Sequence, residues 1–196
     1  MIGIFLDTET NGLNPYMHCA LQIAFRLINV ITGTEYTAFQ SIITPSREEW
    51  KKSDPSSLKI NGFDWEEAQM GKTKEEVKEE IKKIFLNHKI ERGNAVFICQ
   101  NPSFDRAFFS QIIDPTEQEA LLWPYHWLDL ASMYWNESIR LGGKKAARYP
   151  WITGVSKDKI AETYKLPKEN KPHRAMQGVD HLLLCYKAVV GFPQKL

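Results

Sequence analysis

The apolar residues of this chain fall first into short, nearly continuous runs. The run at residues 2–8 predicts a short buried strand, and the runs at residues 21–31 and 35–45 predict two more β-rich segments. The link between the second and third runs, TGTE, contains a glycine and favours a hairpin. Three strands in succession predict that the sheet begins with antiparallel pairing.

Helical spacing appears after a polar segment, residues 46–72, for which the sequence predicts irregular structure. Apolar residues then recur at i, i+4, i+7 and i+8 in KEEVKEEIKKIF. Thr73 precedes this helix as its expected N-cap, with Glu76 at the third helical position. A second helix is predicted over residues 155–166 with Ser156 as its cap, and RAMQGVDHLLLCYKAVV predicts a closing helix.

The middle of the chain adds another strand. AVFICQ, residues 95–100, predicts a buried strand, followed by a loop and a helix for which Ser103 is the expected cap. WLDLASMYW, residues 127–135, is apolar and fits either a strand or a helix. The resulting order predicts an α/β fold over residues 1–196, a single domain in which helices lie on the faces of a mixed sheet.

The composition of the chain limits the kinds of protein it can be. The chain has 196 residues, 43% of them hydrophobic, and a net charge of +1, so no bulk electrostatic attraction to nucleic acid is expected. The three cysteines are widely scattered, and Cys99 and Cys185 lie in apolar runs that predict buried free thiols, which fits a reducing, cytoplasmic setting. The first residues lack a basic region before their acids, and no apolar stretch is long enough to span a membrane, so a soluble protein is expected.

The end of the first predicted strand, IFLDTETNGL, carries two carboxylates. Asp7 and Glu9 are two residues apart, and on a regular strand such residues point to the same side. Their mutual repulsion is unfavourable unless a proton or a cation lies between them. Hard divalent ions such as Mg²⁺ prefer carboxylate oxygens. The alternative is that these acids only cap the following turn.

Two further segments supply candidate site residues. Asp105 in NPSFDRAFF follows a buried strand at the start of a helix, where its alternative role is a favourable interaction with the helix dipole. His173 in PHRAMQGVD stands just before the closing helix. Beside a metal-bound water a histidine can act as general base, although a lone histidine is more often a surface residue.

These three segments, in this order, resemble the motifs of the DEDD exonuclease superfamily, in its histidine-bearing (DEDDh) branch. The segments LKINGF, WLDL and KDKIAETYKLP are similar as well, so the resemblance covers about residues 2–190. It implies a ribonuclease H-like fold with a mixed five-stranded sheet. It also implies metal-dependent removal of nucleotides from the 3′ ends of single-stranded DNA or RNA.

The resemblance also implies roles for the candidate residues. Two Mg²⁺ or Mn²⁺ ions would act together, with Asp7 as the bridging ligand, Glu9 completing one shell and Asp105 holding the other ion. His173 would take a proton from the attacking water. The candidates for substrate binding are of two kinds, residues near the motifs and basic residues of the GGKKAARYP loop: Thr8, Thr10, Phe104, Lys144, Lys145 and Arg148.

One position departs from the pattern of the family. Five residues after His173 the family has an aspartate, whereas this chain has Gly178, and the nearest acid is Asp180. In a regular helix these two positions differ by about 200°, so Asp180 would face away from the site. Either Gly178 permits a bend that brings Asp180 inward as a metal ligand, or the site has only the three acids Asp7, Glu9 and Asp105.

Two rival interpretations follow. An impaired member of the same fold would bind nucleic acid or a protein partner without cleaving, and the glycine at residue 178 favours this alternative. An unrelated α/β protein would use the same acids as caps. Because some members of the family are dimers, a homodimer is a further open alternative.

Overall fold

Strand β1 lies at the centre of a five-stranded mixed sheet. The computed structural model describes residues 1–141 and 149–193. The strand order is β3-β2-β1-β4-β5, with antiparallel pairing from β1 to β3 and parallel pairing from β1 to β5. The strands are β1 (Ile2–Thr10), β2 (Ala20–Asn29), β3 (Glu35–Ile42), β4 (Ala95–Cys99) and β5 (Trp127–Asp129). The predicted α/β class, hairpin and mixed sheet are therefore confirmed.

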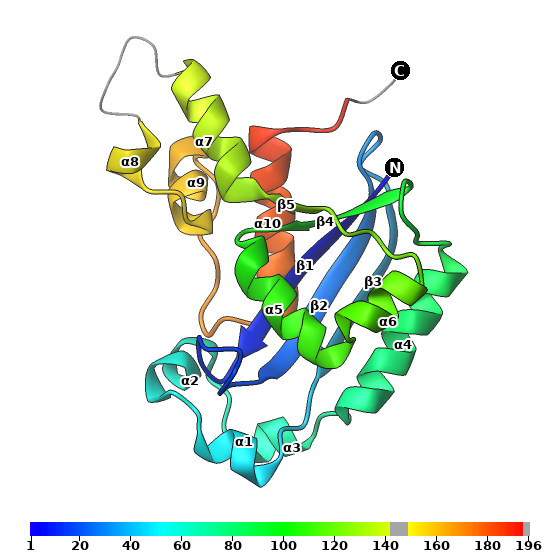
Figure 1. The fold of residues 1–196 in the computed structure, drawn as a ribbon. Helices are drawn as coiled ribbons and strands as arrows, with labels where there is room; N and C mark the ends of the chain where they lie inside the picture. The colour runs from blue at the N-terminus through cyan, green and yellow to red at the C-terminus, as the bar shows by residue number, and fades with distance from the viewer. Residues whose placement is uncertain (142–148, 194–196) are drawn as a thin grey trace.

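Helices cover both faces of this sheet (Figure 1). The helices are α1 (Arg47–Lys51), α2 (Pro55–Asn61), α3 (Trp65–Gln69), α4 (Lys74–Asn87), α5 (Pro102–Ile112), α6 (Pro115–Ala120), α7 (Leu130–Leu141), α8 (Pro150–Thr153), α9 (Lys157–Tyr164) and α10 (Ala175–Val189). The predicted capping box of α4 is present, because the Thr73 side chain accepts from Glu76 N and the Glu76 side chain accepts from Thr73 N. Ser156 caps α9 as predicted.

The alternation of β1 divides the core into two clusters. Ile4 and Leu6 pack with residues of α4 and α5 on one face of the sheet, whereas Phe5 packs with α7, α9 and α10 on the other. Side chains of odd-numbered residues in β1 therefore face α10, and those of even-numbered residues face α5. This division decides where the two acids at the end of the strand point.

Some expectations for the local structure were wrong. Residues 46–72 contain three short helices rather than irregular chain, because Ser46, Asp54 and Asp64 each cap a helix of five to seven residues. Such helices are too short to show apolar periodicity. Ser103 is not the cap of α5; the N-cap is Asn101, whose side-chain oxygen accepts a hydrogen bond from Ser103 Oγ.

The ambiguous segment 127–135 contains both elements. Its first three residues form strand β5, and the chain then enters helix α7 at Leu130. The side chain of Asp129 accepts from Ala131 N at 2.8 Å, which satisfies a free amide of the first helical turn. Short sequence windows cannot separate the two states here because the strand is only three residues long.

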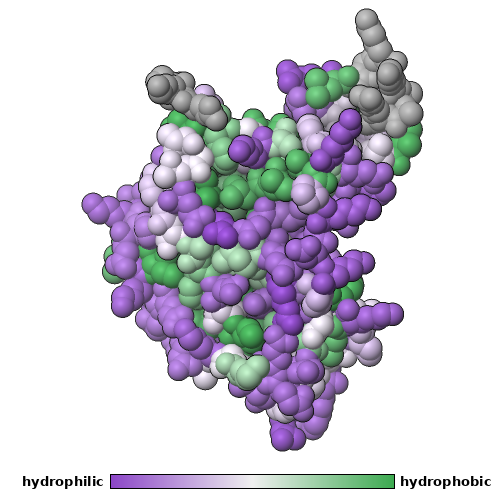
Figure 2. Space-filling view, turned by 180° about the vertical axis from the view of Figure 1, so that it is seen from behind, coloured by the Kyte–Doolittle hydropathy of each residue, from purple (hydrophilic) through white to green (hydrophobic). Residues whose placement is uncertain are grey.

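The buried thiols predicted for Cys99 and Cys185 are present. The three cysteines are free and buried. None of the helices within residues 1–141 and 149–193 has the length and apolarity needed to cross a membrane. Figure 2 shows the molecule from behind, where hydrophilic side chains cover much of the face and hydrophobic ones gather in its upper half.

Candidate active site

The site lies at the end of β1, which extends beyond its parallel neighbour β4. Strand β4 pairs with β1 only from Ile2 to Phe5, whereas β1 continues to Thr10 along β2. Asp7 and Glu9 therefore lie beyond the last parallel pair, and both face the α10 side of the sheet because they are odd-numbered. The end of β1 is thus open to the chain that follows β4, which leads into α5.

Asp105 reaches the same strand from α5. Its Oδ1 accepts hydrogen bonds from Thr8 N at 3.1 Å and from Thr8 Oγ1 at 2.9 Å. Thr8 points to the α5 face, so this pair fixes the carboxylate of Asp105 beside the two acids of β1. Oδ1 of Asp105 is committed to Thr8, and Oδ2 has no hydrogen bond among the described residues.

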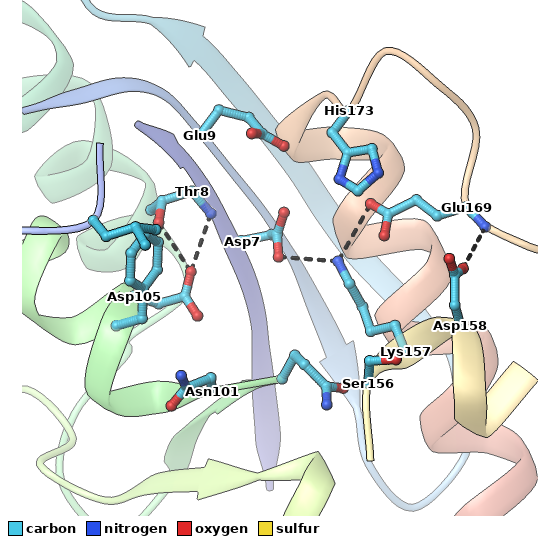
Figure 3. A pocket seen from close by; sticks show the side chains of 13 residues that line it. Asp7, Thr8, Glu9, Asn101, Asp105, Ser156, Lys157, Asp158, Glu169 and His173 are labelled. Carbon is cyan, nitrogen blue, oxygen red and sulfur yellow. Dashed lines mark hydrogen bonds and ion pairs between the residues drawn. The ribbon is translucent and has the colours of Figure 1, made fainter. Parts of the chain in front are cut away.

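These residues line a pocket of about 400 Å³. Four segments that are far apart in the sequence contribute to it, and Figure 3 shows their side chains converging at the end of β1. The lining residues are Asp7, Thr8, Glu9, Leu13, Gln100, Asn101, Phe104, Asp105, Ser156, Lys157, Asp158, Glu169 and His173. The structure therefore brings Asp7, Glu9, Asp105 and His173 together, as the resemblance implied.

The carboxylates of the pocket are poorly solvated and repel one another. Burial and the charge of Asp7 raise the pKa of Glu9 to about 8. Burial, followed by the charge of Asp7, also raises the pKa of Asp105, against the opposing effect of the Thr8 hydrogen bond. The pKa of Asp7 is raised as well, mainly by burial, although Lys157 opposes the shift. The pocket thus favours either protons or bound cations.

The sequence did not single out Lys157 and Glu169, which complete the site. Lys157 Nζ donates to Asp7 Oδ1 at 3.2 Å, to Glu169 Oε1 at 3.3 Å and to the Gly178 carbonyl at 3.3 Å. Neither residue belongs to a spacing that marks a site. A clue to these two residues in the sequence was Gly178. Where the family has an acid this chain has none, so the remaining charged groups of the site need other partners.

Asp180 lies outside the pocket, so of the two alternatives for this position the one that made Asp180 an inward-facing metal ligand is wrong. Gly178 N donates to Arg174 O at 2.9 Å, a regular helical bond, and α10 runs without interruption past this point. Asp180 Oδ1 instead accepts from Arg26 Nε on β2 at 2.6 Å, and its side chain is 51% exposed. The bend at Gly178 that would have made Asp180 a metal ligand is absent.

The structure places only some of the residues predicted to contact substrate in the pocket. Phe104 lines the pocket and is partly buried, so its ring is available there. Thr8 lines the pocket but holds Asp105, and Thr10 is buried with its hydroxyl donating to Gly12 O at 2.7 Å. Thr10 does not line the pocket. The three basic candidates, Lys144, Lys145 and Arg148, lie outside the described residues.

The donor set fits a hard divalent cation, but the side chains are not gathered around one point. In the described part of the chain, no three Asp, Glu, His or Cys residues are placed to hold a metal ion together. One reason is that Asp7 Oδ1 is engaged by Lys157, on the opposite side from Asp105 (Figure 3). Ligation by Asp7, Glu9 and Asp105 would require their side chains to move.

A family model that covers most of the chain identifies the family. The RNase_T family model, described as Exonuclease, matches residues 4–182. The chain belongs to this exonuclease family. The matched range includes the acids of the pocket, His173 and Gly178, so the RNase_T exonuclease domain contains the whole site. The resemblance to nucleases of the DEDD superfamily is confirmed at the level of the family.

Solved structures of nucleases share the fold of this RNase_T domain. Cell-death related nuclease 4 (CRN-4) has a TM-score of 0.72 at 18% identity, over 98% of this chain and 65% of that one. The complex of Escherichia coli exonuclease I with a dT13 oligonucleotide has a TM-score of 0.73 at 16% identity, over 96% of this chain and 40% of that one. No curated protein sequence matches the chain.

A third structure holds both a metal and a nucleic acid. The zinc-bound form of the E. coli exonuclease I complex with single-stranded DNA has a TM-score of 0.70 at 17% identity, over 96% of this chain and 40% of that one. At such identities the likeness establishes the ribonuclease H-like fold. The RNase_T domain described here spans less than two thirds of the length of these proteins.

Proposed function

We propose that this protein is a metal-dependent 3′–5′ exonuclease that removes nucleotides from the ends of single-stranded DNA or RNA. The observation that carries the proposal is the convergence of Asp7, Glu9, Asp105 and His173 on one pocket from three distant segments. Membership of the exonuclease family and the single-stranded DNA in the exonuclease I complexes support it. The 3′ polarity rests on the resemblance alone.

Asp7, Glu9 and Asp105 are the residues that would hold a divalent cation, Mg²⁺ or Mn²⁺. Such an ion, when bound, neutralises the charge of the scissile phosphate and makes water a better nucleophile. The raised pKa values of Glu9 and Asp105 support this assignment, because buried carboxylates without enough positive charge gain from a cation. Thr8 contributes by fixing Asp105 through two hydrogen bonds.

His173 is the proposed general base. It precedes α10, its backbone N–H donates to Ile60 O at 3.0 Å, and its ring lines the pocket near Glu9 and Glu169 (Figure 3). In this position an imidazole nitrogen can accept the proton of a water that attacks the phosphate.

Apolar side chains at the rim of the pocket favour an unpaired terminal base. Phe104 and Leu13 both line the pocket, and Leu13 is 71% exposed. An aromatic ring at such a place stacks on a base whatever its sequence, which suits a single strand whose bases are not already stacked in a duplex. The basic candidates Lys144, Lys145 and Arg148 remain a prediction for contact with the upstream phosphates.

Cleavage of end-labelled oligonucleotides tests this function. Single-stranded DNA and RNA labelled at the 5′ end are incubated with the protein in Mg²⁺, Mn²⁺ or EDTA, beside the variant Asp7→Asn. A ladder that shortens from the 3′ end, needs the metal and is absent with D7N is the expected result. A folded protein that leaves both nucleic acids intact under every condition contradicts the proposal.

A specific observation favours the second candidate, a binding module. Gly178 stands where the family pattern has its fourth acid, and Asp7 is already paired with Lys157. A protein of this kind would bind single-stranded oligonucleotides with similar affinity in EDTA and in Mg²⁺, and would not shorten them. Fluorescence anisotropy with the same oligonucleotides separates the two candidates.

A further inference from the structure

The ammonium of Lys157 is surrounded by oxygen atoms, as a bound metal ion would be. Its ammonium has three oxygen partners, one from each of Asp7, Glu169 and the Gly178 carbonyl, all at 3.2 to 3.3 Å. The side chain is only 13% exposed. Two of the three partners are carboxylates, so the ammonium is held by opposite charges.

Gly178 provides the space for this arrangement. A Cβ built on Gly178 would overlap the carboxylate of Asp7 and would lie 3.0 Å from Lys157 Nζ. Even the smallest side chain at residue 178 would therefore displace Asp7 from its present position. The carboxylate that the family pattern places at this residue and the ammonium of Lys157 compete for the same region of the pocket.

Glu169 supplies a carboxylate close to this region from a different segment. It comes from the chain between α9 and α10, where its backbone N–H donates to Asp158 Oδ1 at 3.2 Å. Its second oxygen lies 3.7 Å from His181 Nδ1. Burial raises the pKa of Glu169, but the neighbouring His181 and the charge of Lys157 outweigh this effect and lower the pKa to about 2, so the group is ionised at neutral pH.

We infer that the ammonium of Lys157 takes the place of one of the two divalent cations expected in this family, so that the pocket binds a single divalent ion. The inference rests on the proposed function. A second divalent ion on the Lys157 side of Asp7 would stand next to the ammonium charge, which is electrostatically unfavourable. The oxygens that Lys157 does not engage, Asp7 Oδ2 and those of Glu9 and Asp105, are left for the remaining ion.

The number of bound ions tests this inference without depending on turnover. Mn²⁺ binding to the metal-free protein is measured by calorimetry and by electron paramagnetic resonance, alone and with a nucleoside 5′-monophosphate as a phosphate probe. One ion per chain is expected for the native protein. Lys157→Met should bind two, because Asp7 and Glu169 then lack a counter-charge.

Lys159→Met is the matched control. Lys159 lies on the same helix two residues further on, pairs with Glu162 and is 51% exposed. K159M should bind one ion, like the native protein. Metal-free K157M should also melt at a lower temperature than K159M and should gain more from Mn²⁺, because the ions restore the missing positive charge.

Each outcome has a distinct meaning. Two ions in the native protein overturn the inference even if K157M does not fold, and they leave the proposed function intact if the oligonucleotides are cleaved. One ion in both proteins overturns it as well, because Lys157 then occupies no ion's place. No bound ion and no cleavage reject the metal-dependent exonuclease itself.

Discussion

At the scale of single residues, the direction of each side chain decides its role. Asp7 and Glu9 face the pocket because they share one face of β1, and Asp180 leaves it because α10 is a regular helix. The grouping of Asp7, Glu9, Asp105 and His173 followed from the motifs. The contacts of Lys157 and Glu169 did not, since they depend on how separate loops meet.

Asp180→Ala should leave cleavage unchanged within about twofold. The side chain is half exposed and pairs with Arg26 on β2, so its removal should lower the free energy of unfolding by less than about 1 kcal/mol. Cleavage rates and chemical denaturation measure the two effects. Asp105→Asn is the comparison and should abolish cleavage; equal losses for both variants would mean that Asp180 acts in the site.

His173→Ala should slow cleavage by about 10²- to 10⁴-fold while Mn²⁺ affinity stays nearly unchanged. The reason is that the proposed role of His173 is to accept a proton, whereas the acids provide the ligands. Single-turnover cleavage and calorimetry provide the two measurements. The exposed His126, which does not line the pocket, gives the control variant His126→Ala. A parallel loss of metal binding would contradict the assignment of His173 as base.

At the scale of elements, the pocket depends on how α9 is anchored. Ser156 caps this helix by accepting from Lys159 N at 3.3 Å, and the very next residue is Lys157. The sequence predicted α4 from its repeating apolar face, and it also predicted α9, with Ser156 as its cap, and the closing helix α10. The helices α1, α2 and α3 escaped prediction because they have no such repeat.

Ser156→Ala should lower the free energy of unfolding by about 1 kcal/mol and should also change metal binding, because the turn that presents Lys157 loses its cap. Thr73→Ala is the control. It removes an equivalent cap from α4, away from the pocket, and should lower stability by a similar amount with unchanged metal binding. Thermal melts and Mn²⁺ titrations of both variants measure these effects. Identical behaviour in the titrations would show that the cap has only a structural role.

At the scale of the whole molecule, the sheet order brings four distant segments to one end of β1. The order of predicted strands and helices indicated a mixed sheet with two covered faces, which the structure confirms. The closeness of the segments around Asp105, Lys157 and Glu169 to β1 could not be derived from local patterns, because it depends on pairing across about a hundred residues or more.

The stability of the metal-free protein should fall as the pH rises from about 5 to 8. Burial and Asp7 raise the pKa of Glu9 to about 8, Glu169 acts in the same direction, and Lys157 and Arg174 oppose the shift. The folded chain therefore holds a proton that the unfolded chain releases near pH 4.5. Between these values the free energy of unfolding should decrease by about 1 kcal/mol per pH unit.

Urea denaturation in EDTA at several pH values measures this slope. Mn²⁺ should reduce it, since a bound cation replaces the proton as the counter-charge. Glu9→Gln is the control variant and should reduce the slope, because its amide does not ionise and only Asp7 and Asp105 still bind protons on folding. Stability that is constant or increases over this pH range would contradict the prediction.

The overlap between a side chain at residue 178 and Asp7 has a consequence for how this site can change over evolutionary time. Restoring an aspartate at residue 178 alone would introduce a clash with Asp7. Removing Lys157 alone would leave Asp7 and Glu169 without their shared counter-charge. Because either substitution by itself is harmful, the two positions are epistatic, and a lineage with the pair Gly178 and Lys157 can reach a four-acid site only by changing both.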